Sequence, residues 1–353
     1  MCPGPKLATP ELPLFDADAP SGCKNGLTAH GRRIAAVFPI ADCSQFDCAK
    51  DDRADLVLRR VVRKAFPLPG AQDWLRRDSG GVSLAQGNYG LLLFSYCGSA
   101  AWVPAADGGR GGHGGRGGHG ELFVARGPSI STARFNHTLL HSFIPQVLSL
   151  RGDLILHATC VVIDGRAFLF AGDSTMGKST LAAGFALQGL DVFSDDIVRI
   201  EIAPDGTPLA HRGYPGVRLR GNSFLLPPAQ RSRRVGRYGL PKHRIYPQAQ
   251  ALQPSPAPVA GVFFLVRGRT VAPVVERLTP MQAMEPFLRA SFLQALPKAT
   301  RSREAFGRAA SLAAAIPAFR LSYRRSAGHF DALLASLLAM MRAPVGVAGS
   351  AGH

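Results

Sequence analysis

Apolar and polar positions follow their clearest pattern in the middle of the chain, around a hairpin signal. Residues 154–163 form an apolar run, Asp164-Gly165 is a strong two-residue turn, and residues 167–171 form a second apolar run. This pattern predicts two antiparallel buried strands. Residues 181–190 are apolar at helical spacing and end near Gly189, which predicts a helix after the second strand. Because a hairpin leads into this strand–helix unit, the sequence indicates a mixed sheet.

Similar patterns extend to both sides of this segment. We expect an amphipathic helix over 134–150, because Phe135, Leu139, Phe143 and Val147 recur at helical intervals. Other expected elements are strands at 191–196, 197–202 and 262–266, a turn-rich basic segment at 203–260, and helices at 280–296, 303–315 and 329–341. Together they predict an α/β fold of the α+β type with a mixed sheet, in a domain spanning residues 131–343.

The N-terminal part predicts a different organisation. Residues 1–30 are rich in Pro, Gly and small polar residues and are expected to form a flexible arm. Residues 31–130 predict a small α+β module, with strands at 34–40 and 88–97 and a helix near 55–65. Residues 344–353 are expected to be a frayed tail.

A Gly-Gly-Arg-Gly-Gly-His repeat fills residues 108–120. An RNA-binding element and a His-rich metal-binding tract are two alternatives. A flexible loop is favoured, because so little apolar surface cannot offset the entropy lost on ordering. We therefore expect this loop to be dispensable for chemistry.

Composition limits the class of protein. At 353 residues with 46% hydrophobic residues, the chain can build a core of one large or two ordinary domains. It has no apolar run long enough to span a membrane and no apolar segment typical of a secretory signal. The six cysteines are scattered without metal-ligand spacing, which favours reduced thiols and a cytoplasmic location.

The formal net charge of +17 is unusual. It is consistent with nucleic acid, with an acidic or phosphate-bearing partner, or with a composition biased toward arginine. The basic residues are scattered and are not interleaved with aromatic residues that could stack on bases. An acidic or phosphate-bearing ligand is therefore favoured over nucleic acid, and a homo-oligomeric state is left open.

The most specific motif follows the second strand of the hairpin. The segment AGDSTMGKST fits the phosphate-loop pattern Gly-x-x-x-x-Gly-Lys-Ser/Thr. Glycines let successive backbone N–H groups point at phosphate oxygens, the lysine brings a charge to the β- and γ-phosphates, and the serine hydroxyl can bind Mg²⁺. The motif predicts a nucleoside triphosphate site formed by Gly172, Asp173, Ser174, Thr175, Met176, Gly177, Lys178, Ser179 and Thr180.

Two adjacent carboxylates, Asp195 and Asp196, end the strand expected after the phosphate loop. A metal–triphosphate complex needs carboxylate ligands, and a kinase benefits from a base that accepts the proton of the acceptor hydroxyl. Since neighbours on an extended backbone face opposite ways, one carboxylate can reach Mg²⁺ while the other faces the acceptor. The alternative is that one caps a turn and the other is solvated.

Residues 156–200 resemble the catalytic segment of HPr kinase/phosphorylase and related P-loop serine kinases. The shared pattern is a His in the strand before a hairpin, the phosphate loop, a short helix ending in Gly, and Ser-Asp-Asp. The resemblance implies the fold that this family shares with phosphoenolpyruvate carboxykinase. Because the Arg-Pro-Gly-Arg-Asn segment of the bifunctional HPr enzymes is missing, the chain is more similar to stand-alone relatives, including those encoded with lasso peptides.

The resemblance also implies an activity and site residues. It implies an ATP- and Mg²⁺-dependent Ser/Thr kinase acting on a small protein or peptide, with His157 near the phosphates. It places Ser179 and either Asp195 or Asp196 at the metal and the other carboxylate as the base, with Asp195 preferred for the metal and Asp196 for the base. Arg218 and Lys242 become candidates for phosphate or acceptor contacts, although each could be a solvated cation and His157 a core histidine. A nucleotide-binding regulatory ATPase and a small-metabolite kinase are the alternative functions.

Overall fold

A computed structural model describes residues 120–214, 216–231, 242–245, 253–270, 272–292 and 298–343, together with short segments between residues 25 and 104. These N-terminal segments are 25–29, 32–36, 56–60, 74–77, 82–85, 91–95 and 97–104. The expected loop at 108–120, apart from Gly120, and the expected tail at 344–353 lie outside the described residues. The chain divides into two compact units, residues 1–152 with 294–298, and residues 153–293 with 299–353. The domain boundary was expected between residues 130 and 131, whereas the division falls after residue 152, so residues 131–152 belong to the first unit.

The first unit contains an eight-stranded sheet in the order β1-β2-β3-β8-β7-β6-β5-β4. Helices α1 (Thr132–Thr138) and α2 (Ile144–Leu150) flank a π-helical turn at Leu139–Phe143, and together they form the expected helix. The strands are β1 (Asn25–Ala29), β2 (Arg32–Ala36), β3 (Leu56–Arg60), β4 (Trp74–Arg77), β5 (Val82–Ala85), β6 (Leu91–Ser95), β7 (Gly98–Pro104) and β8 (Gly120–Arg126).

Two N-terminal expectations are wrong. Residues 55–65 were predicted as a helix, but β3 occupies residues 56–60 and pairs in parallel with β2 and β8. Leu56 and Leu58 are both fully buried, and this two-residue period places them on one face of a strand. The arm expected at 1–30 is also too long, because residues 25–29 form β1, which pairs antiparallel with β2.

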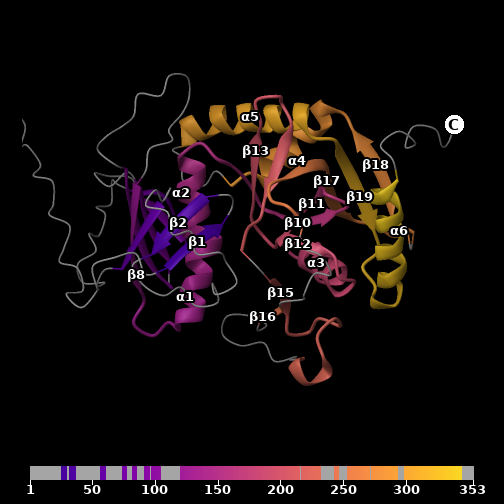
Figure 1. Cartoon of the computed structure of the whole chain (residues 1–353), viewed down its shortest axis with the longest axis horizontal. Coiled ribbons are helices and arrows are strands. Elements are labelled where there is room, and N and C mark those ends of the chain that lie inside the picture. The colour runs from indigo at the N-terminus through magenta and orange to yellow at the C-terminus, as the bar shows by residue number, and fades with distance from the viewer. Residues whose placement is uncertain are drawn as a thin grey trace, which may run out of the picture. The chain divides into compact units, whose positions relative to one another are not determined.

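The second unit is built on a nine-stranded mixed sheet, which confirms the expected mixed α/β class (Figure 1). Its central strand β17 (Ala257–Arg267) runs parallel to both β11 (Arg166–Ala171) and β19 (Ala318–Tyr323). The other strands are β9 (Leu154–Leu156), β10 (Ala158–Ile163), β12 (Asp191–Ser194), β13 (Val198–Ile202), β14 (Pro208–His211) and β18 (Val274–Leu278). A separate ribbon pairs β15 (Val217–Arg220) with β16 (Lys242–Ile245).

The predicted hairpin is confirmed and joins β10 to β11. Asp164 and Gly165 both have positive φ, 50° and 74°, as a two-residue hairpin turn of this kind requires. The single strand expected at 154–163 is instead two strands that break at His157, because β9 pairs with β13 while β10 pairs with β11 and β12. The backbone N–H of His157 donates to the carbonyl of Ala290 at 2.7 Å.

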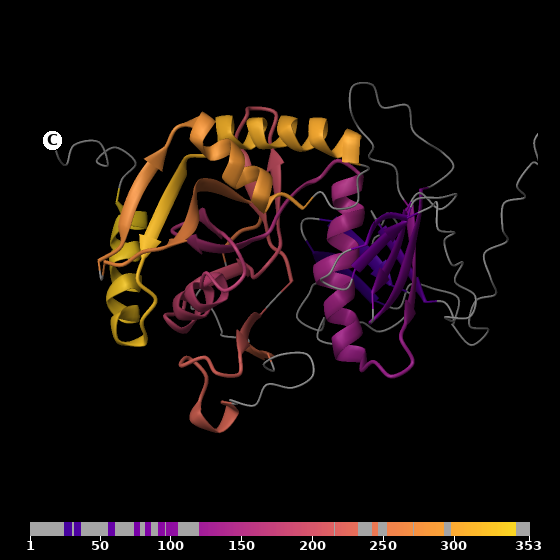
Figure 2. The same ribbon diagram turned by 180° about the vertical axis from the view of Figure 1, so that it is seen from behind.

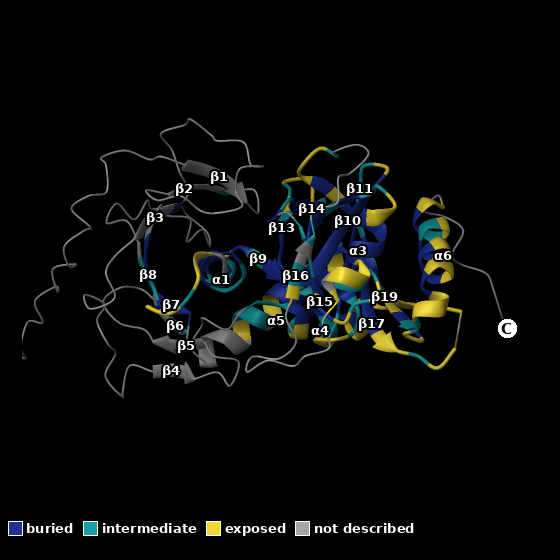
Figure 3. Cartoon of the chain, turned by 90° about the horizontal axis from the view of Figure 1, so that it is seen from below, coloured by how far each residue is buried: buried dark blue, intermediate teal, exposed yellow. Residues whose placement is uncertain are grey.

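Helices cover both faces of this sheet, and two core clusters result (Figures 1 and 2). One cluster joins the sheet to α4 (Pro280–Ala290) and α5 (Lys298–Ala315) through residues such as Phe264, Phe287 and Leu312. The other joins it to α3 (Lys178–Leu187) and α6 (Phe330–Arg342), through Phe170, Phe185 and Leu334 among others. Figure 3 shows the buried central strands β10 and β11 and the buried side of α3 in dark blue. The sheet therefore holds the start of α3 in a fixed position.

No helix in the described part of the chain has the length and apolar character needed to cross a membrane. Cys97 and Cys160 are buried free thiols, and the other four cysteines lie outside the described residues.

Candidate active site

The phosphate loop connects β11 to α3, as the sequence predicts. Gly177 adopts a left-handed conformation with φ 104° immediately before Lys178, the first residue of α3. A Cβ at Gly177 would lie 2.5 Å from the hydroxyl of Tyr323, so no side chain fits there. Buried Lys178 folds back over the loop, and its Nζ donates to the carbonyl oxygens of Gly172 at 2.7 Å and Asp173 at 3.3 Å. These bonds connect the first residue of α3 to the start of the loop.

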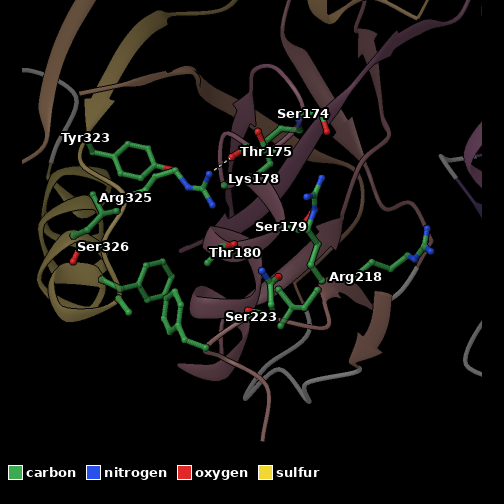
Figure 4. Close-up of a pocket in the computed structure, with 18 of the residues that line it drawn as sticks. Ser174, Thr175, Lys178, Ser179, Thr180, Arg218, Ser223, Tyr323, Arg325 and Ser326 are labelled. Carbon is green, nitrogen blue, oxygen red and sulfur yellow. Dashed lines mark hydrogen bonds between the residues drawn. The ribbon is translucent and has the colours of Figure 1, made fainter. Parts of the chain in front are cut away.

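Residues at the end of β19 hold the loop from one side. The Tyr323 hydroxyl donates to the Met176 carbonyl at 2.7 Å, and the Arg325 guanidinium donates to the Thr175 carbonyl (Figure 4). Burial raises the pKa of Tyr323 to about 12, so its hydroxyl remains a donor at neutral pH. Thr175 itself has a positive φ of 74°, which L side chains rarely adopt. These two bonds, made by residues about 150 positions further along the chain, fix the strained part of the loop.

A cleft of about 520 Å³ opens over the loop and the start of α3. All its lining residues belong to the second unit. Eight of the predicted loop and catalytic residues line it, together with both predicted acceptor contacts: His157, Ser174, Thr175, Gly177, Lys178, Ser179, Thr180, Asp196, Arg218 and Lys242. Gly172, Asp173, Met176 and Asp195 are not among the lining residues.

The two adjacent carboxylates occupy different environments. Asp195 is buried below the cleft and accepts hydrogen bonds from the Thr159 hydroxyl and the Arg218 backbone N–H, each at 3.0 Å. It also hydrogen-bonds the Ser179 side chain. Asp196 has a positive φ of 82° and lines the cleft instead. The Ser194 hydroxyl donates to the Ile197 carbonyl and holds this turn. One carboxylate therefore lies beside Ser179, and the other faces the open cleft.

Asp195 has the properties of a cation ligand. Burial, and secondly the charge of Asp196, raise the pKa of Asp195 from 3.8 to about 7. Its hydrogen-bond donors are neutral groups, and no basic side chain forms a salt bridge with it among the described residues. A divalent cation beside Ser179 would supply the missing positive charge, and carboxylate and hydroxyl oxygens are the ligands that Mg²⁺ prefers. These two residues would hold it.

His157 and Lys178 lie close to Asp196 and to each other. Burial lowers the pKa of His157, and the charge of Asp196 only partly offsets this. Burial also lowers the pKa of Lys178, although Asp196 and Asp195 both act to raise it. The proximity of these groups is the arrangement expected from the sequence. A triphosphate beside Lys178 would favour its charged form.

Several lining residues were not predicted from the sequence. One group lies at the end of β15 and just after it, namely Arg220, Asn222, Ser223 and Phe224. Another lies at the end of β19 and just after it, namely Tyr323, Arg324, Arg325, Ser326 and Ala327. The alternation of buried Leu321 and Tyr323 with the more exposed Arg320 and Ser322 is a strand signal that could have identified β19. Nothing in the sequence pattern indicates that this strand ends beside the phosphate loop.

Comparisons with known proteins identify no family for the chain. No protein-family model matches it, and no curated protein matches it. Among solved structures, the HPr(Ser) kinase/phosphatase from Coxiella burnetii is similar at 12% identity, over 53% of this chain and 88% of that chain, with a TM-score of 0.25. This similarity is distant.

The stability of the ligand-free protein should depend on Asp195. The unfolded chain releases this proton near pH 3.8 and the folded protein near 7. The free energy of unfolding therefore falls as pH rises from about 4 to 7, because the folded protein binds this proton more tightly than the unfolded chain does. We expect Asp195→Asn to raise the melting temperature at pH 8 by several degrees, and the gain to vanish near pH 4.

Thermal denaturation at the two pH values measures this effect. Asp205→Asn is the control, because Asp205 is fully exposed and its replacement relieves no buried charge. Mg²⁺ with ATP should stabilise the parent protein and have little effect on Asp195→Asn. A variant that melts at or below the parent temperature at pH 8 would contradict the buried, uncompensated charge of Asp195, and equal stabilisation of both proteins by Mg²⁺ with ATP would contradict its assignment as a metal ligand.

Proposed function

We propose that this protein is an ATP- and Mg²⁺-dependent kinase that phosphorylates a Ser or Thr hydroxyl of a small protein or peptide. One observation carries the proposal: Ser179, the buried Asp195 and the cleft-facing Asp196 meet at the start of α3, beside the phosphate loop. A binding protein needs the loop, but it does not need a second carboxylate facing open space beside it. The separation of the two carboxylates supports a division into metal ligand and base.

The chemistry follows from these positions. The loop N–H groups, Lys178 and the start of α3 hold the β- and γ-phosphates. Mg²⁺ on Ser179 and Asp195 would neutralise charge on these phosphates. The acceptor oxygen forms a bond to the γ-phosphorus while the bond from that phosphorus to the β–γ bridging oxygen breaks, and ADP leaves with the electron pair. The hydroxyl proton passes to the carboxylate of Asp196.

Label transfer distinguishes this proposal from its alternatives. The full-length protein is incubated with Mg²⁺ and either [γ-³²P]ATP or [α-³²P]ATP, in the presence of a serine- and threonine-containing peptide library and a pool of hydroxylated metabolites. We expect peptide-bound label from the γ position and none from the α position. Label on a metabolite would point to a small-metabolite kinase, and free phosphate alone would point to a regulatory ATPase.

A further inference from the structure

The cleft carries more positive charge than a nucleotide neutralises. Among the described residues, six cationic side chains line it, against the single carboxylate of Asp196. When Asp195, which lies below the cleft, is also counted, there are six cationic side chains and two carboxylates. The cleft therefore has an excess of four positive charges. A magnesium–ATP complex contributes about two net negative charges. The six cations are Lys178, Arg218, Arg220, Lys242, Arg324 and Arg325.

Three of these cations belong to the ribbon of β15 and β16. Val217 and Leu219 are buried and pack with Ala182 and Ala183 of α3, which fixes the ribbon against the helix that begins at the phosphate loop. The register places Arg220 directly opposite Lys242, and both side chains are exposed. Like charges in directly opposed positions destabilise a strand pair. Neither residue forms a salt bridge with any other residue that the structure describes.

The ribbon lies at the carboxylate end of the cleft. The backbone N–H of Arg218, in β15, donates to Asp195 Oδ2 at 3.0 Å. The charge of Lys242 contributes to the lowered pKa of both His157 and Lys178, so Lys242 lies near the same groups as Asp196. Arg325, in contrast, contacts the phosphate loop, and Figure 4 shows Tyr323 and Arg325 across the cleft from Arg218. The ribbon cations are therefore placed beside the proposed base.

We propose that the β15–β16 ribbon docks an acidic segment of the acceptor, with Asp or Glu side chains flanking the hydroxyl that is phosphorylated. Arg220 and Lys242 pair with these carboxylates, which relieves their mutual repulsion and brings the hydroxyl next to Asp196. This inference rests on the proposed kinase function. It adds to that function a substrate class and the structural element that selects it.

Charge reversal tests the proposal. Serine peptides that differ only in having Glu, Ala or Lys on both sides of the serine are compared as acceptors and as fluorescein-labelled ligands in the presence of Mg²⁺ and ADP. We expect the parent protein to prefer the Glu peptide to the Ala peptide by about tenfold or more. Arg220→Glu and Lys242→Glu should remove this preference, and the double variant should favour the Lys peptide. Arg277→Glu is the matched control, because Arg277 is exposed on β18, outside the cleft, and the net charge changes equally.

Each result supports or contradicts one claim. Equal binding of the three peptides by the parent protein would overturn the docking proposal, as would a Glu preference that survives in both ribbon variants. Tighter binding of a single-stranded RNA than of the Glu peptide would also overturn it. Charge-selective peptide binding without any label transfer would leave the docking surface in place and contradict the kinase function instead.

Discussion

Asp196→Asn should lower the single-turnover rate of phosphoryl transfer by a factor on the order of 10²–10⁴. The amide keeps the shape of the side chain but cannot accept the hydroxyl proton. Because Asp196 lines the cleft while Asp195 lies beside Ser179, the variant should bind ATP nearly as tightly as the parent. Asp195→Asn should show the converse defect, with the Mg²⁺ dependence moved to higher concentration. Rapid-quench transfer and ATP affinity are measured for both variants.

The comparison with Asp205→Asn controls for the loss of one surface charge, since this exposed residue lies outside the cleft. If Asp195→Asn lowers the transfer rate and Asp196→Asn shifts the Mg²⁺ dependence, the roles of base and metal ligand are reversed, and the kinase mechanism still holds. If both variants bind and transfer like the parent, the carboxylates are structural, and the proposed mechanism loses its base and its metal ligand.

Lys178→Ala should abolish most transfer, by a factor of roughly 10²–10³ or more. The variant loses the charge aimed at the β- and γ-phosphates, while Gly177 and the bonds from Tyr323 and Arg325 still define the loop backbone. The protein should therefore remain folded, with a melting temperature close to that of the parent. Lys178→Arg should restore little activity, because the guanidinium is larger and planar and cannot occupy the same position.

Transfer rates of these variants are compared with that of Arg277→Ala, which removes an exposed cation of β18 that does not line the cleft. Undiminished turnover in folded Lys178→Ala protein would rule out this loop as the active site.

The sequence predicted the segment from β10 to β12 well because each signal there is local. Asp164-Gly165 specifies a tight turn by backbone conformation alone, and Gly177 takes a left-handed φ of 104° that glycine adopts without strain. The helix was expected at 181–190 but occupies Lys178–Leu187 and begins directly at the loop. Terminal positions of helices depend on capping contacts that periodicity does not record.

Long-range contacts explain what the sequence did not predict. Residues 154–163 are apolar apart from His157 and Thr159, and one polar residue in such a run does not indicate that the chain passes from one strand partner to another there. The segment 56–60 is a strand and not the expected helix, because a short apolar run fits the period of either element. The roles of Tyr323 and Arg325 depend on the parallel pairing of β19 with β17, which joins segments that are distant in the sequence.

In the candidate site, too, the local motifs were predictable from the sequence and the long-range contacts were not. The motif identified Lys178 and Ser179, and the adjacent carboxylates were identified as a pair, but the sequence could not tell which one faced inward. The turn after β12, where Asp196 takes a positive φ, separates the buried from the cleft-facing side chain. The sequence indicates Arg218 and Lys242 as candidate contacts, whereas the position of Arg220 directly opposite Lys242 follows only from the pairing of β15 with β16.

Calorimetric titration of ATP into the full-length protein, with Mg²⁺ and then with EDTA in place of the metal, tests the central claim most directly. The claim is that the phosphate loop, Ser179 and Asp195 form one site for a metal–nucleoside triphosphate complex. We expect one saturable site per chain in Mg²⁺, competition by ADP and by inorganic tripolyphosphate, and much weaker binding in EDTA. The absence of saturable binding, or an affinity that does not depend on Mg²⁺, would contradict the account.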